Sequence, residues 1–370
     1  MKSLSRHLIP FLFLSTASAL PAQEVLNWGD FELCNDCGIE ITELVRLGDA
    51  DGPGIIEGGS PMVVWSEDLG YLYFPLGGSM IKIFDHEGTF VREIGGEGDG
   101  PGEFRSIIDV EVIDGRIAVL DGAKRAVVIL SPAGEYLARH GYEFVPGRIS
   151  SAGRGRIVVT STNTWSRDVD QPLHLMDLTS GATTLEFGAA NAGAEKTDAD
   201  RRFIGMVRGS VVSRAGTVWW GSIRTPAVQE WSLEGELVRD FDGELPWFPE
   251  LSDWPDLAKE PPGTLLEGLA LDPEDRLWML VVTADAAWDE VELGVAHDEA
   301  VVPTGSGDDA EDSRLDVFDL RERRHVGRYV WDESSGVMLD RGGAPAVAVL
   351  EYSDAMVPQI VVYGVGAGGR

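Results

Sequence analysis

The chain has 370 residues, with 30 Lys and Arg against 62 Asp and Glu, so its formal net charge is −32. This charge excludes non-specific nucleic-acid binding and docking on anionic membranes as the main role, because both need a basic surface. The hydrophobic fraction of 44% is enough for a buried core, and the 45 glycines indicate many tight turns.

The N-terminus has the pattern of a cleaved export signal. Two basic residues precede a short apolar run, Leu8–Leu14, and small residues follow it. The run is far shorter than the ~20 residues that a membrane span needs. We therefore predict a signal peptide over residues 1–22, cleaved after Ala22 or Ala19, and a periplasmic or secreted mature protein.

The two cysteines of the chain, Cys34 and Cys37, lie in the next segment, residues 23–40. Haem attachment would need a His where Gly38 follows, and a zinc site would need further ligands, for which there is no second CxxC. A thioredoxin-like motif would need a βαβ context, which the pattern lacks. In an exported protein we expect a local disulfide between the two cysteines.

A pattern of short apolar strands and Asp/Gly turns recurs five times after this segment. Its clearest copies are residues 70–95 and 115–141, where β-branched and aromatic residues alternate with polar ones. The second strand of each copy begins near Leu72, Ile117, Ile157, Val218 and Leu277, at spacings of 45, 40, 61 and 59 residues. These spacings are at or above the roughly 40–50 residues of a four-stranded propeller blade.

The two ends of the chain complete a sixth copy. The C-terminal region supplies three strand patterns, and residues 41–54 (ITELVRLGDADGPG) match residues 90–102 (FVREIGGEGDGPG), the end of the first full copy. We therefore expect Ile41–Leu47 to be the outer strand of the C-terminal blade, which would close the ring. The predicted fold is an all-β, six-bladed β-propeller over residues 41–366. A β-sandwich would not account for the repeat.

Three motifs resemble the NHL-type and related exported bacterial six-bladed propellers. They are GPGEF at 100–104, IKIFDHEG at 81–88 and GLALDPEDRLWML at 268–280. The resemblance implies the fold and its turns. It does not imply one chemistry, because members of this architecture include binding modules, calcium-dependent lactonases and zinc-dependent lyases.

Every long connection in the expected propeller belongs to one face, the face of the second-to-third turns and the links between blades. These connections are residues 96–103, 160–171, 189–203, 244–263 and 284–312. Long loops on a rigid scaffold are common sites of function. We therefore predict a binding face for a cell-envelope or extracellular peptide, glycan or protein.

The long loops carry aromatic and acidic residues. Trp165, Trp247, Trp254 and Trp288 could stack on such a ligand, or could instead pin the loops over the propeller. The many acids of residues 284–312 would suit calcium, but their spacing fits no calcium motif, and a solvated acidic loop is the favoured interpretation.

Aligning the copies places one set of polar residues on the innermost strands around the central channel. The set is Asp109, Arg148, Arg208 and Glu267, with Glu111 two residues beyond Asp109. Two guanidinium groups would repel a divalent cation and could bind an anionic ligand. The same residues could instead form a closed ring of Arg–carboxylate pairs that lines the channel.

No nucleophile elbow, phosphate loop or dinucleotide motif is found, and no His falls on an innermost strand. We therefore predict a binding protein without a resident cofactor. The alternative is a calcium-dependent hydrolase, similar to the lactonases, or a lyase that uses Glu267, Asp109 and Glu111.

Overall fold

The structure is a computed structural model that describes residues 23–34, 36–57, 61–161, 171–188, 209–212, 216–223, 225–249, 256–257, 259–295, 301–303, 310–332 and 336–367. The expected signal peptide and three predicted site residues, Trp165, Arg208 and Trp254, lie outside these ranges. In the described part of the chain, no helix is long and apolar enough to cross a membrane.

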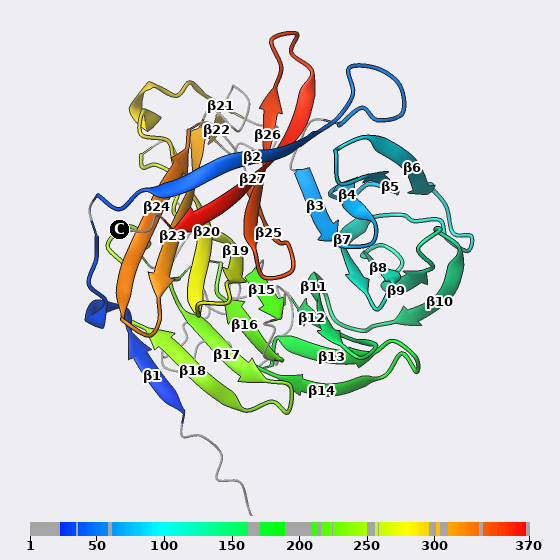
Figure 1. Cartoon of the computed structure of the whole chain (residues 1–370), viewed down its shortest axis with the longest axis horizontal. Coiled ribbons are helices and arrows are strands. Elements are labelled where there is room, and N and C mark those ends of the chain that lie inside the picture. The colour runs from blue at the N-terminus through cyan, green and yellow to red at the C-terminus, as the bar shows by residue number, and fades with distance from the viewer. Residues whose placement is uncertain are drawn as a thin grey trace, which may run out of the picture.

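Six sheets stand around a central channel, which confirms the six-bladed propeller (Figure 1). Blade 1 holds β3 (Pro61–Ser66), β4 (Gly70–Pro75), β5 (Met80–Phe84) and β6 (Phe90–Gly95). Blade 2 holds β7 (Ile107–Ile113), β8 (Arg116–Asp121), β9 (Ala126–Leu130) and β10 (Tyr136–Gly141). Blade 3 holds β11 (Pro146–Gly153), β12 (Arg156–Ser161), β13 (Leu173–Asp177) and β14 (Thr183–Phe187).

The second half of the ring is less regular. Blade 4 holds β15 (Gly209–Val212), β16 (Thr217–Gly221), β17 (Val228–Ser232) and β18 (Leu237–Asp242). Blade 5 holds β19 (Leu265–Leu271), β20 (Arg276–Ala284), β23 (Glu311–Asp319) and β24 (Arg324–Trp331). Its insertion carries η2 (Trp288–Glu290) and the hairpin β21 (Leu293–Val295) and β22 (Val301–Pro303).

Blade 6 is shared by the two ends of the chain. Its inner strands are β25 (Gly336–Asp340), β26 (Pro345–Tyr352) and β27 (Pro358–Ala367), and its outer strand is β2 (Ile39–Leu47). Strand β2 lies antiparallel to β27 over its whole length, from Ile39 opposite Ala367 to Leu47 opposite Ile360 (Figure 1). The hydrogen bonds of this pairing join the N-terminal part of the chain to the last blade.

The segment before β2 adds to the propeller instead of standing apart from it. Strand β1 (Glu24–Asn27) pairs in parallel with β18, so the fourth sheet has five strands. The single turn η1 (Trp28–Asp30) follows, and Glu32 and Gly38 then form parallel bridges to β24. We call the described residues between Glu24 and Gly38 the strap, because they run along the outer edges of blades 4 and 5 before β2 joins blade 6.

Among the described residues, the core consists of six apolar clusters, one between each pair of neighbouring blades. For example, one cluster joins blades 1 and 2 through Phe74 and Val119, and another joins blades 4 and 5 through Trp219 and Phe318. Four tryptophans of the blade strands are buried in these clusters: Trp219, Trp220, Trp231 and Trp278. Each blade therefore depends on both of its neighbours for burial of its apolar faces.

The turn between the third and fourth strands sets how closely neighbouring blades pack. Gly134 ends the β9–β10 turn at φ +89°, where a side chain is strained. A Cβ there would lie 2.6 Å from Ile94 Cγ2 on the outer strand of the preceding blade. The turn that Gly134 ends thus serves a contact between blades.

Candidate functional site in the central channel

The innermost strands of the six blades, β3, β7, β11, β15, β19 and β25, surround the channel. A blade of four antiparallel strands ends at the face where it began, so the innermost strands all run in the same direction. The links between blades and the β12–β13 and β20–β23 connections consequently share the face at which the innermost strands begin. All five long connections expected from the sequence belong to these two kinds.

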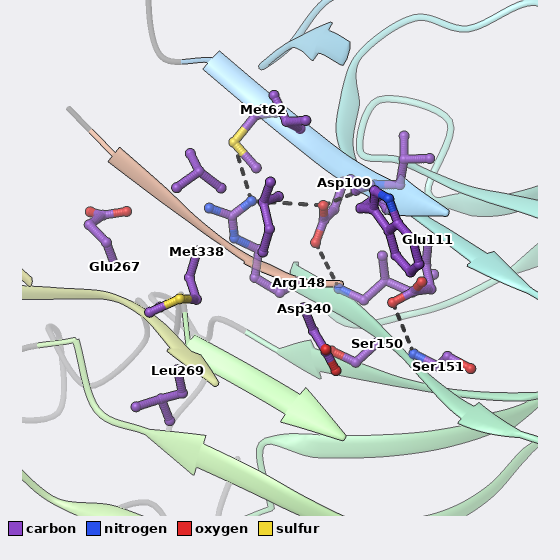
Figure 2. A pocket seen from close by; sticks show the side chains of 18 residues that line it. Met62, Asp109, Glu111, Arg148, Ser150, Ser151, Glu267, Leu269, Met338 and Asp340 are labelled. Atoms are coloured by element: carbon purple, nitrogen blue, oxygen red, sulfur yellow. Dashed lines mark hydrogen bonds and ion pairs between the residues drawn. The ribbon is translucent and has the colours of Figure 1, made fainter. Parts of the chain in front are cut away.

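A cavity of about 250 Å³ lies inside the channel, and among the side chains that the structure describes, residues of β3, β7, β11, β19 and β25 line it. Four of the five channel residues predicted from the sequence, Asp109, Glu111, Arg148 and Glu267, line it (Figure 2). The fifth, Arg208, lies outside the described residues.

The lining is arranged in two levels. Asp109, Arg148, Glu267 and Met338 are each the third residue of their strands. Two residues further along each strand are Glu111, Ser150, Leu269 and Asp340, which also line the cavity. The first level lies closer to the long-loop face.

Arg148 is held loosely at the first level. Its Nη1 is 3.8 Å from Asp109 Oδ1 and 3.3 Å from the thioether sulfur of Met62 (Figure 2). By contrast, Arg314 Nε lies 2.6 Å from a carboxylate oxygen of Asp316. The Arg148 guanidinium therefore has weaker charged contacts than a fully paired arginine in the same protein.

Two carboxylates of β7 hold the edge of the neighbouring strand β11. Asp109 accepts a hydrogen bond from the Ile149 N–H at 3.0 Å, and Glu111 accepts one from the Ser151 N–H at 3.1 Å. Each carboxylate also accepts the backbone N–H of the residue that follows it. These carboxylates satisfy backbone donors where two blades meet without pairing as strands.

Burial raises the pKa of both carboxyl groups. Burial raises the pKa of Glu111 to about 8. The negative charges of Asp109 and Asp340 raise this pKa further, whereas hydrogen bonds from the Val112 and Ser151 N–H groups lower it. Burial also raises the pKa of Asp109, against the charge of Arg148 and two backbone hydrogen bonds. Glu111 is therefore mostly neutral near pH 7, and the channel holds less negative charge than its composition suggests.

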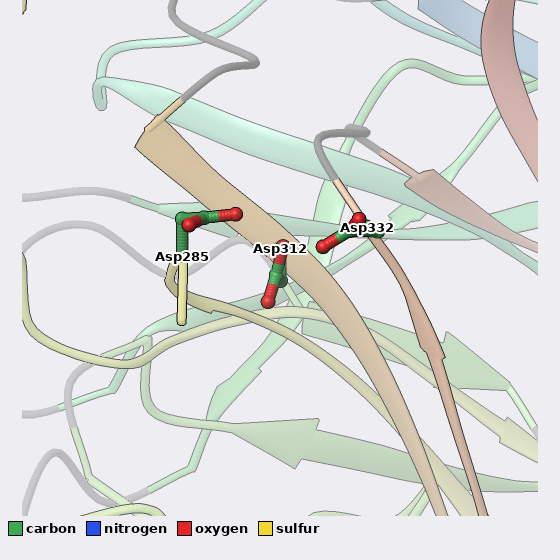
Figure 3. A group of neighbouring side chains, drawn as sticks. All are labelled: Asp285, Asp312 and Asp332. Atoms are coloured by element: carbon green, nitrogen blue, oxygen red, sulfur yellow. The ribbon is translucent and has the colours of Figure 1, made fainter. Parts of the chain in front are cut away.

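These residues do not fit a calcium site. Calcium needs six to eight oxygen ligands, whereas the carboxylates of Asp109 and Glu111 already accept backbone N–H groups and Arg148 adds a positive charge beside Asp109. Within the described residues, three carboxylates come within 4.8 Å of one another only in blade 5, at Asp285, Asp312 and Asp332 (Figure 3). That group lies outside the channel.

Two of the four long-loop tryptophans, Trp247 and Trp288, lie in the described part of the chain, and both are partly buried. Trp247 packs on the cluster between blades 4 and 5, where its ring stacks on Phe318 and carries the Arg314 guanidinium 4.0 Å above it. Trp288 lies in η2 of the blade 5 insertion. The position of Trp247 fits the alternative in which it pins its loop.

Sequence reasoning missed several lining residues, among them Met62, Trp65, Met338 and Asp340. Asp340 follows Met338 by two residues, as Glu111 follows Asp109. Extending the alignment of innermost strands to the C-terminal copy would have found it. The methionines carry no sequence signal that separates a channel position from a core position.

Comparisons with known proteins agree with this architecture. A family model, DUF5128, described as a 6-bladed beta-propeller, matches residues 77–151. The chain is a six-bladed β-propeller. No curated protein matches the sequence significantly.

Solved structures similar to this propeller cover nearly all of it at low identity. A Bacteroides fragilis protein described as exported shares 12% identity at a TM-score of 0.56, over 94% of this chain and 100% of the other. A Bacteroides vulgatus member of the duf4221 family shares 9% identity at a TM-score of 0.60, over 90% of this chain and 100% of the other. A catalytically inactive virginiamycin B lyase from Staphylococcus aureus, with quinupristin, shares 10% identity at a TM-score of 0.50, over 88% of this chain and 99% of the other. Identities this low establish the fold alone.

Proposed function

We propose that this propeller is an exported binding protein that takes a polar ligand into the channel from the long-loop face. The observation that carries the proposal is the cavity of about 250 Å³ with Arg148 at its first level. A concave site with a few converging polar groups is the usual form of a small-ligand site. The ligand would be a peptide, glycan or protein segment of the cell envelope or the extracellular space.

Export rests on three observations. Residues 1–22 have the pattern of a signal peptide, Cys34 and Cys37 form a disulfide, and one similar structure is described as exported. Disulfides persist in the periplasm and outside the cell and are rare in the reducing cytosol. We therefore propose a periplasmic or secreted location.

The chemistry of the first level favours a carboxylate or another oxyanion on the ligand. Arg148 has only a 3.8 Å contact with Asp109, so a ligand carboxylate could form the closer bidentate pair that arginine prefers. Neutral Glu111 at the second level would not repel such a group. The thioethers of Met62 and Met338 supply adaptable apolar surface beside it.

The test is a thermal-shift screen of the mature protein against acidic peptides and uronic-acid glycans, each paired with its amide or neutral analogue. A ligand raises the melting temperature by mass action if it binds only the native state. We expect carboxylate-bearing hits that are lost in Arg148→Gln and kept in the matched exposed variant Arg154→Gln. Hits that survive Arg148→Gln and are lost in Trp288→Ala would place binding on the rim and overturn the channel proposal.

The same screen separates binding from the calcium-dependent alternative. We expect no change in melting temperature with a chelator or with added calcium. Stabilisation by calcium that is lost in Glu267→Gln or Asp109→Asn, with lactone or ester turnover, would favour the hydrolase or lyase and sink the binding proposal.

A further inference from the structure

The disulfide lies in the strap at the point where the chain is about to enter the closing strand β2. Cys34 and Cys37 form the disulfide, and β2 begins two residues later at Ile39. We propose that this disulfide is an oxidation-dependent latch, which holds the strap on blade 5 and thereby secures the ring closure by β2. Nothing in the binding proposal depends on it.

Backbone hydrogen bonds attach the strap to β24 on both sides of the disulfide. On the N-terminal side, the Glu32 N–H donates to the Arg323 carbonyl at 2.9 Å, and the His325 N–H donates to the Glu32 carbonyl at 3.0 Å. On the C-terminal side, the Arg328 N–H donates to the Cys37 carbonyl at 2.8 Å. The disulfide therefore lies between two points at which the strap is attached to β24.

A buried side chain also meets the disulfide loop. His325 is 2% exposed, and its Nδ1 lies 3.2 Å from the Cys34 carbonyl oxygen. Its Nε2 lies 2.9 Å from Asp316 Oδ1, which also contacts Arg328 Nε at 3.1 Å. The position of the Cys34 carbonyl is thus coupled to the buried charges of blade 5.

Ile39, the first residue of β2, packs closely on β24. A Cβ on Gly327 of β24 would lie 2.7 Å from Ile39 Cγ1, so a larger residue at position 327 would have to displace the Ile39 side chain. Ile39 is 8% exposed and belongs to the cluster between blades 5 and 6. A displaced disulfide loop would therefore disturb the first residue of the closing strand.

The disulfide is accessible to a reagent. Both cysteines are half-buried, and they line a pocket of about 660 Å³ between the strap and β24. A thiol–disulfide oxidoreductase or a small disulfide is the chemical class that would act there. In forming the latch, the two thiols lose two protons and two electrons, and the electrons reduce the disulfide of the oxidant to two thiols.

Closing even a short loop restricts the unfolded strap, so oxidation favours the attached state. Reduction should raise local opening where the strap meets β24 and leave the cores of the blades that the strap does not touch, such as blade 2, intact. Amide hydrogen exchange reports such local opening residue by residue.

The experiment is amide exchange on the mature protein, oxidised and then reduced with dithiothreitol, with a free-thiol count to verify reduction. We expect the amides of His325 and Arg328 to exchange on the order of tenfold faster after reduction, as the loop entropy suggests. Amides in β8 of blade 2 should not change. Oxidised glutathione should restore slow exchange.

A double variant, Cys34→Ser with Cys37→Ser, separates the latch from side effects of the reductant. It should show the faster exchange without reductant and no further response to it. Unchanged exchange at His325 and Arg328 in fully reduced protein would overturn the proposal. An equal acceleration in β8 would also overturn it, because the disulfide would then stabilise the whole fold and not the strap.

Discussion

At the scale of single residues, two buried carboxyl groups of the chain have pKa values shifted in opposite directions. Glu111 lies in the channel and stays protonated to about pH 8 because burial outweighs its two backbone hydrogen bonds. Asp316 in blade 5 is completely buried, yet hydrogen bonds from His325 and Arg314 overcome the effect of burial and hold its pKa below the ordinary value. The difference comes from the cations that contact Asp316 directly.

Glu111 should make the protein less stable as pH rises. Its native pKa exceeds the unfolded value of about 4.3, so between these values the native state keeps a proton that the unfolded state has lost. Each pH unit in that window costs about 1.4 kcal/mol. In Glu111→Gln, urea unfolding at pH 5, 7 and 8.5 should show a flatter dependence. The exposed control Glu135→Gln should retain the wild-type slope; equal slopes in all three proteins would refute the assignment.

Asp316 should make the protein more stable as pH rises. Its lowered pKa stabilises the fold above pH ~4, and that contribution is lost as pH falls through the native value. Asp316→Asn leaves Arg314, Arg328 and His325 without their buried anion, which costs roughly 3–5 kcal/mol at pH 7. Urea unfolding measures the loss. Asp99→Asn, which removes the exposed pair with Arg105, should change little by comparison.

At the scale of elements, the turns between third and fourth strands join the blades. Gly134 approaches Ile94 of blade 1, and Gly88 approaches the Arg46 carbonyl of β2 in blade 6. The same turn therefore ends a hairpin and meets the outer strand of the blade before it. A side chain there would be strained in its backbone and would also push two blades apart.

Gly134→Ala should consequently destabilise the protein by about 1–3 kcal/mol, because it combines a positive φ with overpacking. Thermal melting gives the measurement. A matched control is Gly115→Ala, which also has a positive φ but meets nothing within 4 Å of its Cβ. If both variants lose the same stability, the contact between blades contributes nothing beyond the backbone strain.

At the scale of the whole molecule, stability depends on closing the ring. Blade 6 without β2 would leave the edge of β27 unpaired and the cluster between blades 6 and 1 open to water, including Val45 and Leu47. The strap adds a second attachment through Trp28, which is 1% exposed and donates from its indole nitrogen to the Pro226 carbonyl at 2.8 Å.

Two N-terminal truncations test this arrangement. A chain that starts at Gly38 keeps β2 but loses the strap, and should fold with a lower melting temperature. A chain that starts at Gly48 loses β2 as well, and should aggregate or lack the cooperative transition. Size-exclusion chromatography and circular dichroism distinguish these results. A cooperative, monomeric fold from the Gly48 start would show that β2 is dispensable.

The blade architecture could be predicted from the sequence, because strand alternation and Asp/Gly turns are local signals that recur along the chain. The likeness of residues 41–54 to residues 90–102 was enough to predict where β2 pairs, since both are outer strands followed by the same link. The placement of Asp109, Arg148 and Glu267 on the channel also followed, because equivalent positions in repeated strands occupy equivalent positions in the ring.

The surroundings of those residues, by contrast, depend on the folded chain and could not be predicted. The protonation of Glu111 depends on burial and on Asp340, which is 229 positions away in sequence. The strap is attached to β24 by the hydrogen bond between Arg328 and Cys37, and neither segment has a periodic pattern that predicts it. Burial, charge pairing and close packing depend on which residues meet in space. A sequence repeat predicts such contacts only where the blades are alike.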